Sequence, residues 1–196
     1  ISLKYTNYNE VKPDEPIVPP EDNEPPVETR TSEDGLAFIK NMEGFAAKPY
    51  VDTDGHYTIG YGTWCKTEYV SYYNKNPMTR EQADKALRKS VKAFEADVDK
   101  FEKTHGITFT QQQYDALMSM TYNVGTGWIN PSYRICQYLM DGYEKYSQDE
   151  MVNAIGSWCH VGKDVVHGLA IRRVREAFLF LYGDYDNKGD VGYTYV

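Results

Sequence analysis

The sequence predicts an α+β fold in which helices dominate and one small β-hairpin lies near the front of the chain. Apolar residues recur at helical spacing through most of the chain after residue 32. Only the segment 48–63 combines an Asp-Gly turn signal with flanking Tyr, Thr and Ile, the composition of a hairpin. Strands and helices do not alternate, so the sheet should be segregated from the helices.

The first 31 residues predict a flexible tether. This region holds six of the nine prolines and almost nothing apolar, so it favours extended polyproline conformations over a packed core. Residues 1–32 carry seven acids and three bases, which is half of the net charge of −8. Attachment to a larger assembly or anchor is the expected use, and a polyproline ligand for another protein is the alternative.

A folded domain is expected from 32 to 183. A short helix starts behind the polar "TSEDG" and ends near Glu43, and the hairpin and a loop to Met78 follow. Thr79 with Gln82, and Thr110 with Gln113, have capping-box spacing and predict the starts of a long amphipathic helix and a core helix. Shorter helical patterns follow at 132–142, 148–158 and 168–181, and the tail 184–196 has little to pack.

Composition argues against several classes of protein. An acidic chain is a poor match for nucleic acid, and no run of about 18 apolar residues predicts a membrane span. The four histidines lack metal-site spacing, and "IGYG" lacks the third glycine of a dinucleotide loop, so no metal or cofactor is expected. Buried free thiols are expected for the cysteines, with one disulfide as the alternative: Cys65, Cys136 and Cys159.

Two carboxylates flank the start of the hairpin in unlike surroundings. Glu43 at a helix end, against Phe45 and the apolar helix face, should be partly desolvated and suited to hold a proton. Asp52, in a polar turn region, should stay ionised. Hydrolysis of a glycosidic bond uses such a pair. The spacing alone is not specific, because a solvated Glu and a turn Asp are the ordinary interpretation.

The wider pattern is more specific. Eight residues separate Glu43 from Asp52, and five separate Asp52 from Thr58. Ile-Gly-Tyr-Gly follows Thr58 directly. This closely resembles the catalytic signature of phage-type lysozymes, family 24 of the glycoside hydrolases. The resemblance covers about 32–183 and continues in order through "MTREQADKAL", "QYDALMSMTYNVGTG", Trp158 and "HGLAIRRVREAFLFL". It implies a lysozyme-like fold with a cleft between the hairpin region and a helical lobe.

The resemblance also implies an activity. It indicates a muramidase that cleaves the β-1,4 bond between N-acetylmuramic acid and N-acetylglucosamine in peptidoglycan, with inversion. Glu43 would be the general acid, Asp52 the carboxylate that activates water, and Thr58 a hydroxyl that helps hold that water. The expected setting is a monomer acting in the periplasm or cell wall, delivered by a phage or secreted.

Substrate contacts are expected from three residues. Tyr61 and Tyr122 lie in motif segments and suit a sugar-lining role, and Asn123 is a candidate by family position. The arginines near the end of the chain could meet anionic wall polymers, although a solvated helix face is the favoured interpretation: Arg172, Arg173 and Arg175.

The chain departs from the family pattern at two positions. Thr63 stands where His is frequent, which rules out a His ion pair that would anchor the hairpin. Ile171 stands where Asn is frequent, which removes a polar contact near the groove or only adjusts packing. Two rival functions stay open. One is a lytic transglycosylase, which needs a single acid, and the other is a non-catalytic wall-binding or structural module.

Overall fold

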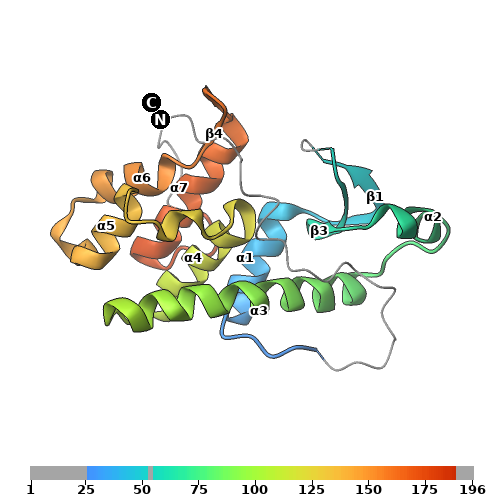
Figure 1. Ribbon diagram of the computed structural model, residues 1–196, viewed down its shortest axis with the longest axis horizontal. Coiled ribbons are helices and arrows are strands. Elements are labelled where there is room, and N and C mark those ends of the chain that lie inside the picture. Colours follow the sequence, from blue (N-terminus) through green and yellow to red (C-terminus); the bar gives the residue numbers. More distant parts are fainter. Residues whose placement is uncertain (1–25, 53–54, 189–196) are drawn as a thin grey trace.

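The computed structural model describes residues 26–52 and 55–188. Figure 1 shows a small sheet with α2 at one end of the molecule and α4 to α7 at the other, with α3 running along one side. The helices are α1 (Glu33–Glu43), α2 (Thr67–Lys75), α3 (Arg80–His105), α4 (Gln111–Val124), α5 (Arg134–Asp141), α6 (Gln148–Gly156) and α7 (His167–Tyr182). The strands are β1 (Ala46–Val51), β2 (Tyr57–Gly60), β3 (Thr63–Trp64), β4 (His160–Val161) and β5 (Asp164–Val165).

The predicted α+β layout with a segregated sheet is confirmed. Strands β1, β2 and β3 form one antiparallel sheet in that order. Helix α1 ends at Glu43 as predicted, and both predicted capping boxes are present at the starts of α3 and α4. Among the helices of the described ranges, none combines the length and apolarity that a bilayer span requires.

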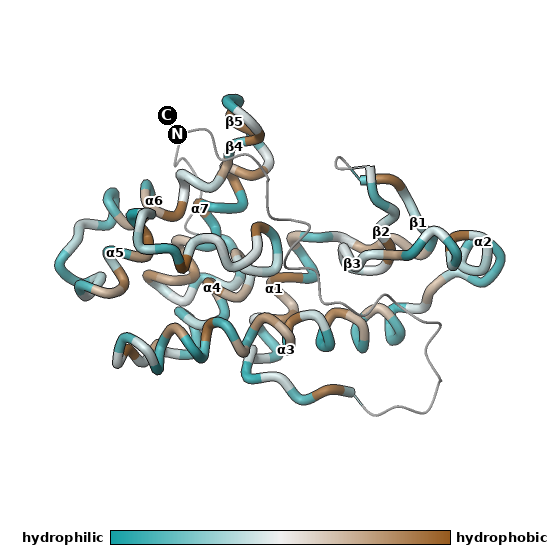
Figure 2. The backbone as a smooth tube through the Cα atoms, in the orientation of Figure 1, coloured by the Kyte–Doolittle hydropathy of each residue, from teal (hydrophilic) through white to brown (hydrophobic). Residues whose placement is uncertain are grey.

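The core lies where α4 meets its neighbours. Helix α4 packs against α1, α3 and α7, and its residues from Gln113 to Tyr122 are buried on every side. Figure 2 shows hydrophobic and hydrophilic positions alternating along α3, as an amphipathic helix requires. Its predicted stripe is buried throughout: Ala83, Leu87, Val91, Phe94, Val98 and Phe101. The three cysteines are buried free thiols, as expected.

The structure differs from the prediction in its smaller elements. Helix α2 occupies part of the segment that was expected to be a loop. Lys66, before the first turn, makes no side-chain cap, so the sequence carries no start signal. Burial of Tyr73 in the hydrophobic core and packing of α2 against β1 hold the helix. Strand β3 adds a third strand to the hairpin, and β4 pairs with β5 in a second, two-stranded sheet. Two-residue strands are too short to show alternation.

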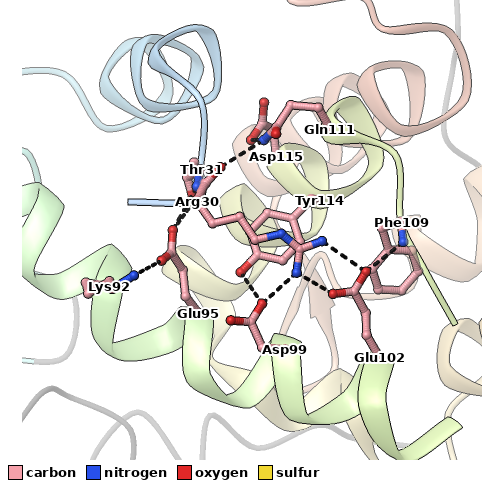
Figure 3. Close-up of polar contacts among 10 residues, drawn as sticks. All are labelled: Arg30, Thr31, Lys92, Glu95, Asp99, Glu102, Phe109, Gln111, Tyr114 and Asp115. Carbon is pink, nitrogen blue, oxygen red and sulfur yellow. Dashed lines mark hydrogen bonds and ion pairs between the residues drawn. The ribbon is translucent and has the colours of Figure 1, made fainter. Parts of the chain in front are cut away.

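The residues before α1 are packed onto the domain (Figure 3). Thr31 is buried, and its backbone N–H and its hydroxyl donate to Glu95 Oε1 at 2.8 and 3.0 Å. The backbone N–H of Ser32 donates to Asp115 Oδ1 at 3.0 Å. The hydroxyl of Tyr185, beyond α7, donates to the same carboxylate at 2.7 Å. Both edges of the expected domain are therefore tied to it by buried carboxylates.

Arg30 extends this attachment. Its guanidinium pairs with Asp99 at 2.7 Å and with Glu102, and it lies 3.8 Å from the centre of the Tyr114 ring (Figure 3). Glu102 itself is buried. Arg30 and Thr31 thus contact the domain, although their composition-based place is in the predicted tether. Residues 1–25 of the predicted tether and 189–196 of the predicted tail lie outside the described residues.

We expect truncation to distinguish the residues before position 29 from the attached residues Arg30 and Thr31. A chain starting at residue 29 keeps Arg30 and Thr31, and its melting temperature should stay close to that of the full chain. A chain starting at residue 32 leaves buried carboxylates without their partners, which costs about 2 kcal/mol or more. That loss corresponds to a fall of about 4–8 °C at this chain length.

Thermal unfolding followed by circular dichroism measures the difference. Glu28→Ala, at an exposed position before the attachment, is the matched control and should not change the melting temperature. Equal melting temperatures for the two truncated chains would show that Arg30 and Thr31 add nothing to the stability of the domain.

Candidate active site

Glu43 is the last residue of α1 and its carboxylate meets the turn between β2 and β3. Gly44, with φ +69°, ends the helix and redirects the chain into β1. A Cβ atom at Gly62 would lie 2.9 Å from Glu43 Oε2, and the φ of Gly62 is +82°. Glycine is therefore required at position 62 both by the backbone conformation and by the close approach of the carboxylate.

A buried guanidinium holds the other side of this carboxylate. Arg172 Nη1 lies 2.6 Å from Glu43 Oε1, and the two side chains are 8% and 17% exposed. Arg172 also donates from Nε to Glu176 Oε1 at 2.9 Å and from Nη2 to the carbonyl oxygen of Ser119 at 3.1 Å. The guanidinium thus connects α1, α4 and α7. Glu43 is partly desolvated as predicted, but its immediate neighbour is a cation.

The charge at Arg172 is permanent. Burial works to lower the pKa of its guanidinium, but the negative charges of Glu43 and Glu176 outweigh burial, so this pKa is raised above its ordinary value. Arg173 is fully buried as well, with Nε 2.8 Å from Glu176 Oε2. The predicted solvated helix face is therefore wrong for Arg172 and Arg173.

A signal for this burial was present in the sequence. Glu176 lies four residues after Arg172 and three residues after Arg173, and side chains at these spacings meet on one helix face. That spacing predicts an ion-paired cluster within the helix. It does not predict the long-range partner, because Glu43 lies 129 residues away along the chain.

Asp52 and Thr58 are brought together by the hairpin. Asp52 follows β1 directly, and its Oδ2 accepts a hydrogen bond from Thr58 Oγ1 at 2.9 Å. The other oxygen, Oδ1, accepts from the backbone N–H of His56 at 2.9 Å. The Asp52 N–H donates to the His56 carbonyl at 2.9 Å, which continues the ladder past the strand end. The turn therefore holds this carboxylate through neutral donors.

Both carboxylates influence the phenol of Tyr50. Burial raises the pKa of Tyr50, and the negative charges of Glu43 and Asp52 raise it further. Because such an effect falls off steeply with distance, Tyr50 lies within electrostatic range of both groups. Asp52 and Thr58 are thus joined by a hydrogen bond, and the Glu43 carboxylate reaches the same sheet at its β2–β3 turn.

The tyrosines expected to contact substrate are mostly buried. Tyr61 and Tyr122 are 7% and 8% exposed, and the Tyr122 hydroxyl donates to the Tyr61 carbonyl at 2.7 Å, which ties α4 to the β2–β3 turn. Asn123 Oδ1 accepts from Arg173 Nη2 at 2.8 Å. Each of these groups has a structural partner, and contact with substrate through their remaining exposed edges stays a prediction.

The two departures from the family pattern lie beside this site. The Thr63 hydroxyl in β3 is buried, with no hydrogen-bond partner among the described residues. Ile171 is 38% exposed on α7, directly before Arg172, so it does not fill the core.

Comparison with known proteins is consistent with these observations. Residues 40–176 match the family described as phage lysozyme, a range that includes both Glu43 and Glu176. The endolysin of Bacillus phage B103 is 37% identical over 158 residues, which is 80% of this chain and 56% of that protein. The chain thus spans about half the length of this relative and of the 37% identical endolysin of Bacillus phage PZA, of which it covers 55%.

Solved structures show the same architecture. The endolysin of Escherichia coli O157:H7 phage FAHEc1 has a TM-score of 0.57 at 27% identity, covering 81% of this chain and 97% of that one. The lysozyme of phage P22 has a TM-score of 0.57 at 25% identity, covering 79% of this chain and 99% of that one. From the matched range and the shared fold, the chain belongs to the phage lysozyme family.

Proposed function

We propose that this chain is a peptidoglycan hydrolase of the muramidase type. It cleaves the β-1,4 bond between N-acetylmuramic acid and N-acetylglucosamine in lysis of the bacterial cell wall. Family membership and the endolysin relatives support this proposal. The observation that carries it is a pair of carboxylates held in unlike ways, Glu43 by a buried cation and Asp52 by neutral donors.

In the proposed mechanism Glu43 protonates the leaving oxygen. The transfer leaves a carboxylate behind, and the fixed charge of Arg172 at 2.6 Å compensates it at once. The bond from Arg172 and the contact with Gly62 also limit the orientations open to the carboxyl group. This preorganisation favours proton transfer along one direction.

Asp52 and Thr58 act together on the attacking water. The bond from Thr58 Oγ1 to Asp52 Oδ2 sets the two groups side by side, so a water held by both is oriented and activated by the carboxylate. Attack on the sugar face opposite the leaving group gives inversion. A lytic transglycosylase would need no such second group, and a non-catalytic module would need neither.

The proposed setting follows from the substrate. The enzyme acts outside the cytoplasmic membrane, in the periplasm or cell wall, after delivery by a phage or after secretion. It works as a monomer, and its N-terminal region attaches the domain to a larger assembly or anchor. Product analysis of digested peptidoglycan tests the reaction itself, since new reducing ends, anhydro ends or no cleavage distinguish the three functions.

Glu43→Gln is expected to lower the rate of wall hydrolysis by at least about 100-fold. Glutamine keeps the shape and can still accept a hydrogen bond from Arg172, but it has no proton of the required acidity. Turbidity loss of a wall suspension measures the rate. Glu81→Gln, on an exposed part of α3, is the matched control and should keep full activity. Near-normal activity of Glu43→Gln would refute the role of Glu43.

Thr58→Val should slow turnover by about 10-fold or more while binding of wall fragments survives, because only the hydroxyl is removed. Thr58→Ser keeps a hydroxyl and should retain most of the activity. Steady-state kinetics on soluble fragments separates the two effects. Equal rates for the Val and Ser variants would argue against a role for this hydroxyl.

Stereochemistry gives an independent test of the water-activating role of Asp52. Nuclear magnetic resonance of the product formed within the first minutes should show the inverted anomer. Retention of configuration would instead require a covalent intermediate and would exclude the proposed mechanism.

A further inference from the structure

Tyr50 shares one face of the sheet with the proposed catalytic groups of the hairpin. In the β1–β2 ladder Tyr50 stands directly opposite Thr58. Opposed residues of an antiparallel pair project from the same face, and so do residues two apart along a strand. Tyr50, Asp52 and Thr58 therefore belong to one face, and the hydrogen bond between Asp52 and Thr58 confirms this for two of them.

The phenol of Tyr50 is also within electrostatic range of Glu43. Glu43 and Asp52 both act electrostatically on Tyr50, although they come from the end of α1 and from the hairpin. The Glu43 carboxylate reaches the β2–β3 turn at Gly62, and Tyr50 stands opposite Thr58 in β2, so the same sheet carries the phenol and meets Glu43. The strand register and the electrostatic influence of both carboxylates are consistent with one place for Tyr50, on the face of the sheet that carries Asp52 and Thr58.

Tyr50 is also available for contact. Tyr50 is 45% exposed, and no hydrogen bond joins its hydroxyl to another described residue. Tyr61 and Tyr122 differ in both respects, since they are buried and their hydroxyls are engaged with Arg80 and with the Tyr61 carbonyl. An exposed aromatic ring whose hydroxyl has no partner among the described residues suits an amphipathic ligand.

We propose that Tyr50 is a direct substrate contact at the cleavage point. The apolar face of its ring packs against the C–H face of an N-acetylated sugar, and its hydroxyl hydrogen-bonds to a polar group of that sugar. The inference rests on the proposed function, since the sugar is the one placed between Glu43 and Asp52. It assigns substrate recognition to a residue that takes no part in proton transfer.

Binding is measured separately from catalysis to test this role. In a Glu43→Gln background, titration with soluble, uncross-linked peptidoglycan strands gives the dissociation constant without turnover. Tyr50→Ala and Tyr50→Leu should each weaken binding by about 10-fold or more, since both remove the flat ring. Tyr50→Phe keeps the ring and should lose only about 2–5-fold, the share of the hydroxyl.

Tyr72→Ala is the matched control. Tyr72 is 46% exposed, nearly the same as Tyr50, but lies on α2, and its loss should change the dissociation constant by less than about 2-fold. Melting temperatures confirm that each variant folds. Tyr50→Leu, which retains a large apolar strand residue, serves if Tyr50→Ala does not fold.

Two outcomes overturn the role of Tyr50, and only the second also overturns the proposed function. If the unmodified chain releases reducing ends from walls and Tyr50→Leu binds strands as tightly as its parent, the role of Tyr50 is refuted and the proposed function stands. If the unmodified chain neither binds strands nor releases products, the proposed function and the inference fall together.

Discussion

The ion pair between Arg172 and Glu43 is the interaction on which the arrangement of the site depends. One buried guanidinium contacts the end of α1, the backbone of α4 and a carboxylate of its own helix α7. A buried charge is tolerated only when it is paired and its donors are used. Three helices must therefore meet at one point, and Glu43 is held at that point.

The sheet completes the site through a different kind of constraint. Gly62 lets the β2–β3 turn approach the Glu43 carboxylate, while Asp52 and Thr58 are positioned within the hairpin by its own register. One carboxylate is thus fixed by long-range packing and the other by local structure. The two carboxylates are therefore positioned by different means.

The same principle operates away from the site. Helices α3 and α4 bury Glu95, Glu102 and Asp115, and segments distant in sequence supply the partners of these carboxylates. Arg30 and Thr31 contribute from before α1, and Tyr185 contributes from beyond α7. Both edges of the domain thus supply hydrogen-bond partners to buried carboxylates of α3 and α4, and Arg30 adds a positive charge, so these residues belong to the folded unit.

The sequence by itself determined what depends on near neighbours. Helical stripes and two capping boxes predicted most helices, and the Asp-Gly turn signal predicted the hairpin. The resemblance to phage-type lysozymes singled out Glu43, Asp52 and Thr58, and the structure joins Asp52 to Thr58 by a hydrogen bond. Only the tertiary structure decided the partner of Glu43, the attachment of Arg30, the existence of α2 and the exposure of Tyr50 in contrast to Tyr61 and Tyr122. Periodicity and caps record contacts within a few residues, whereas burial and ion pairing join segments whose separation leaves no pattern in one sequence.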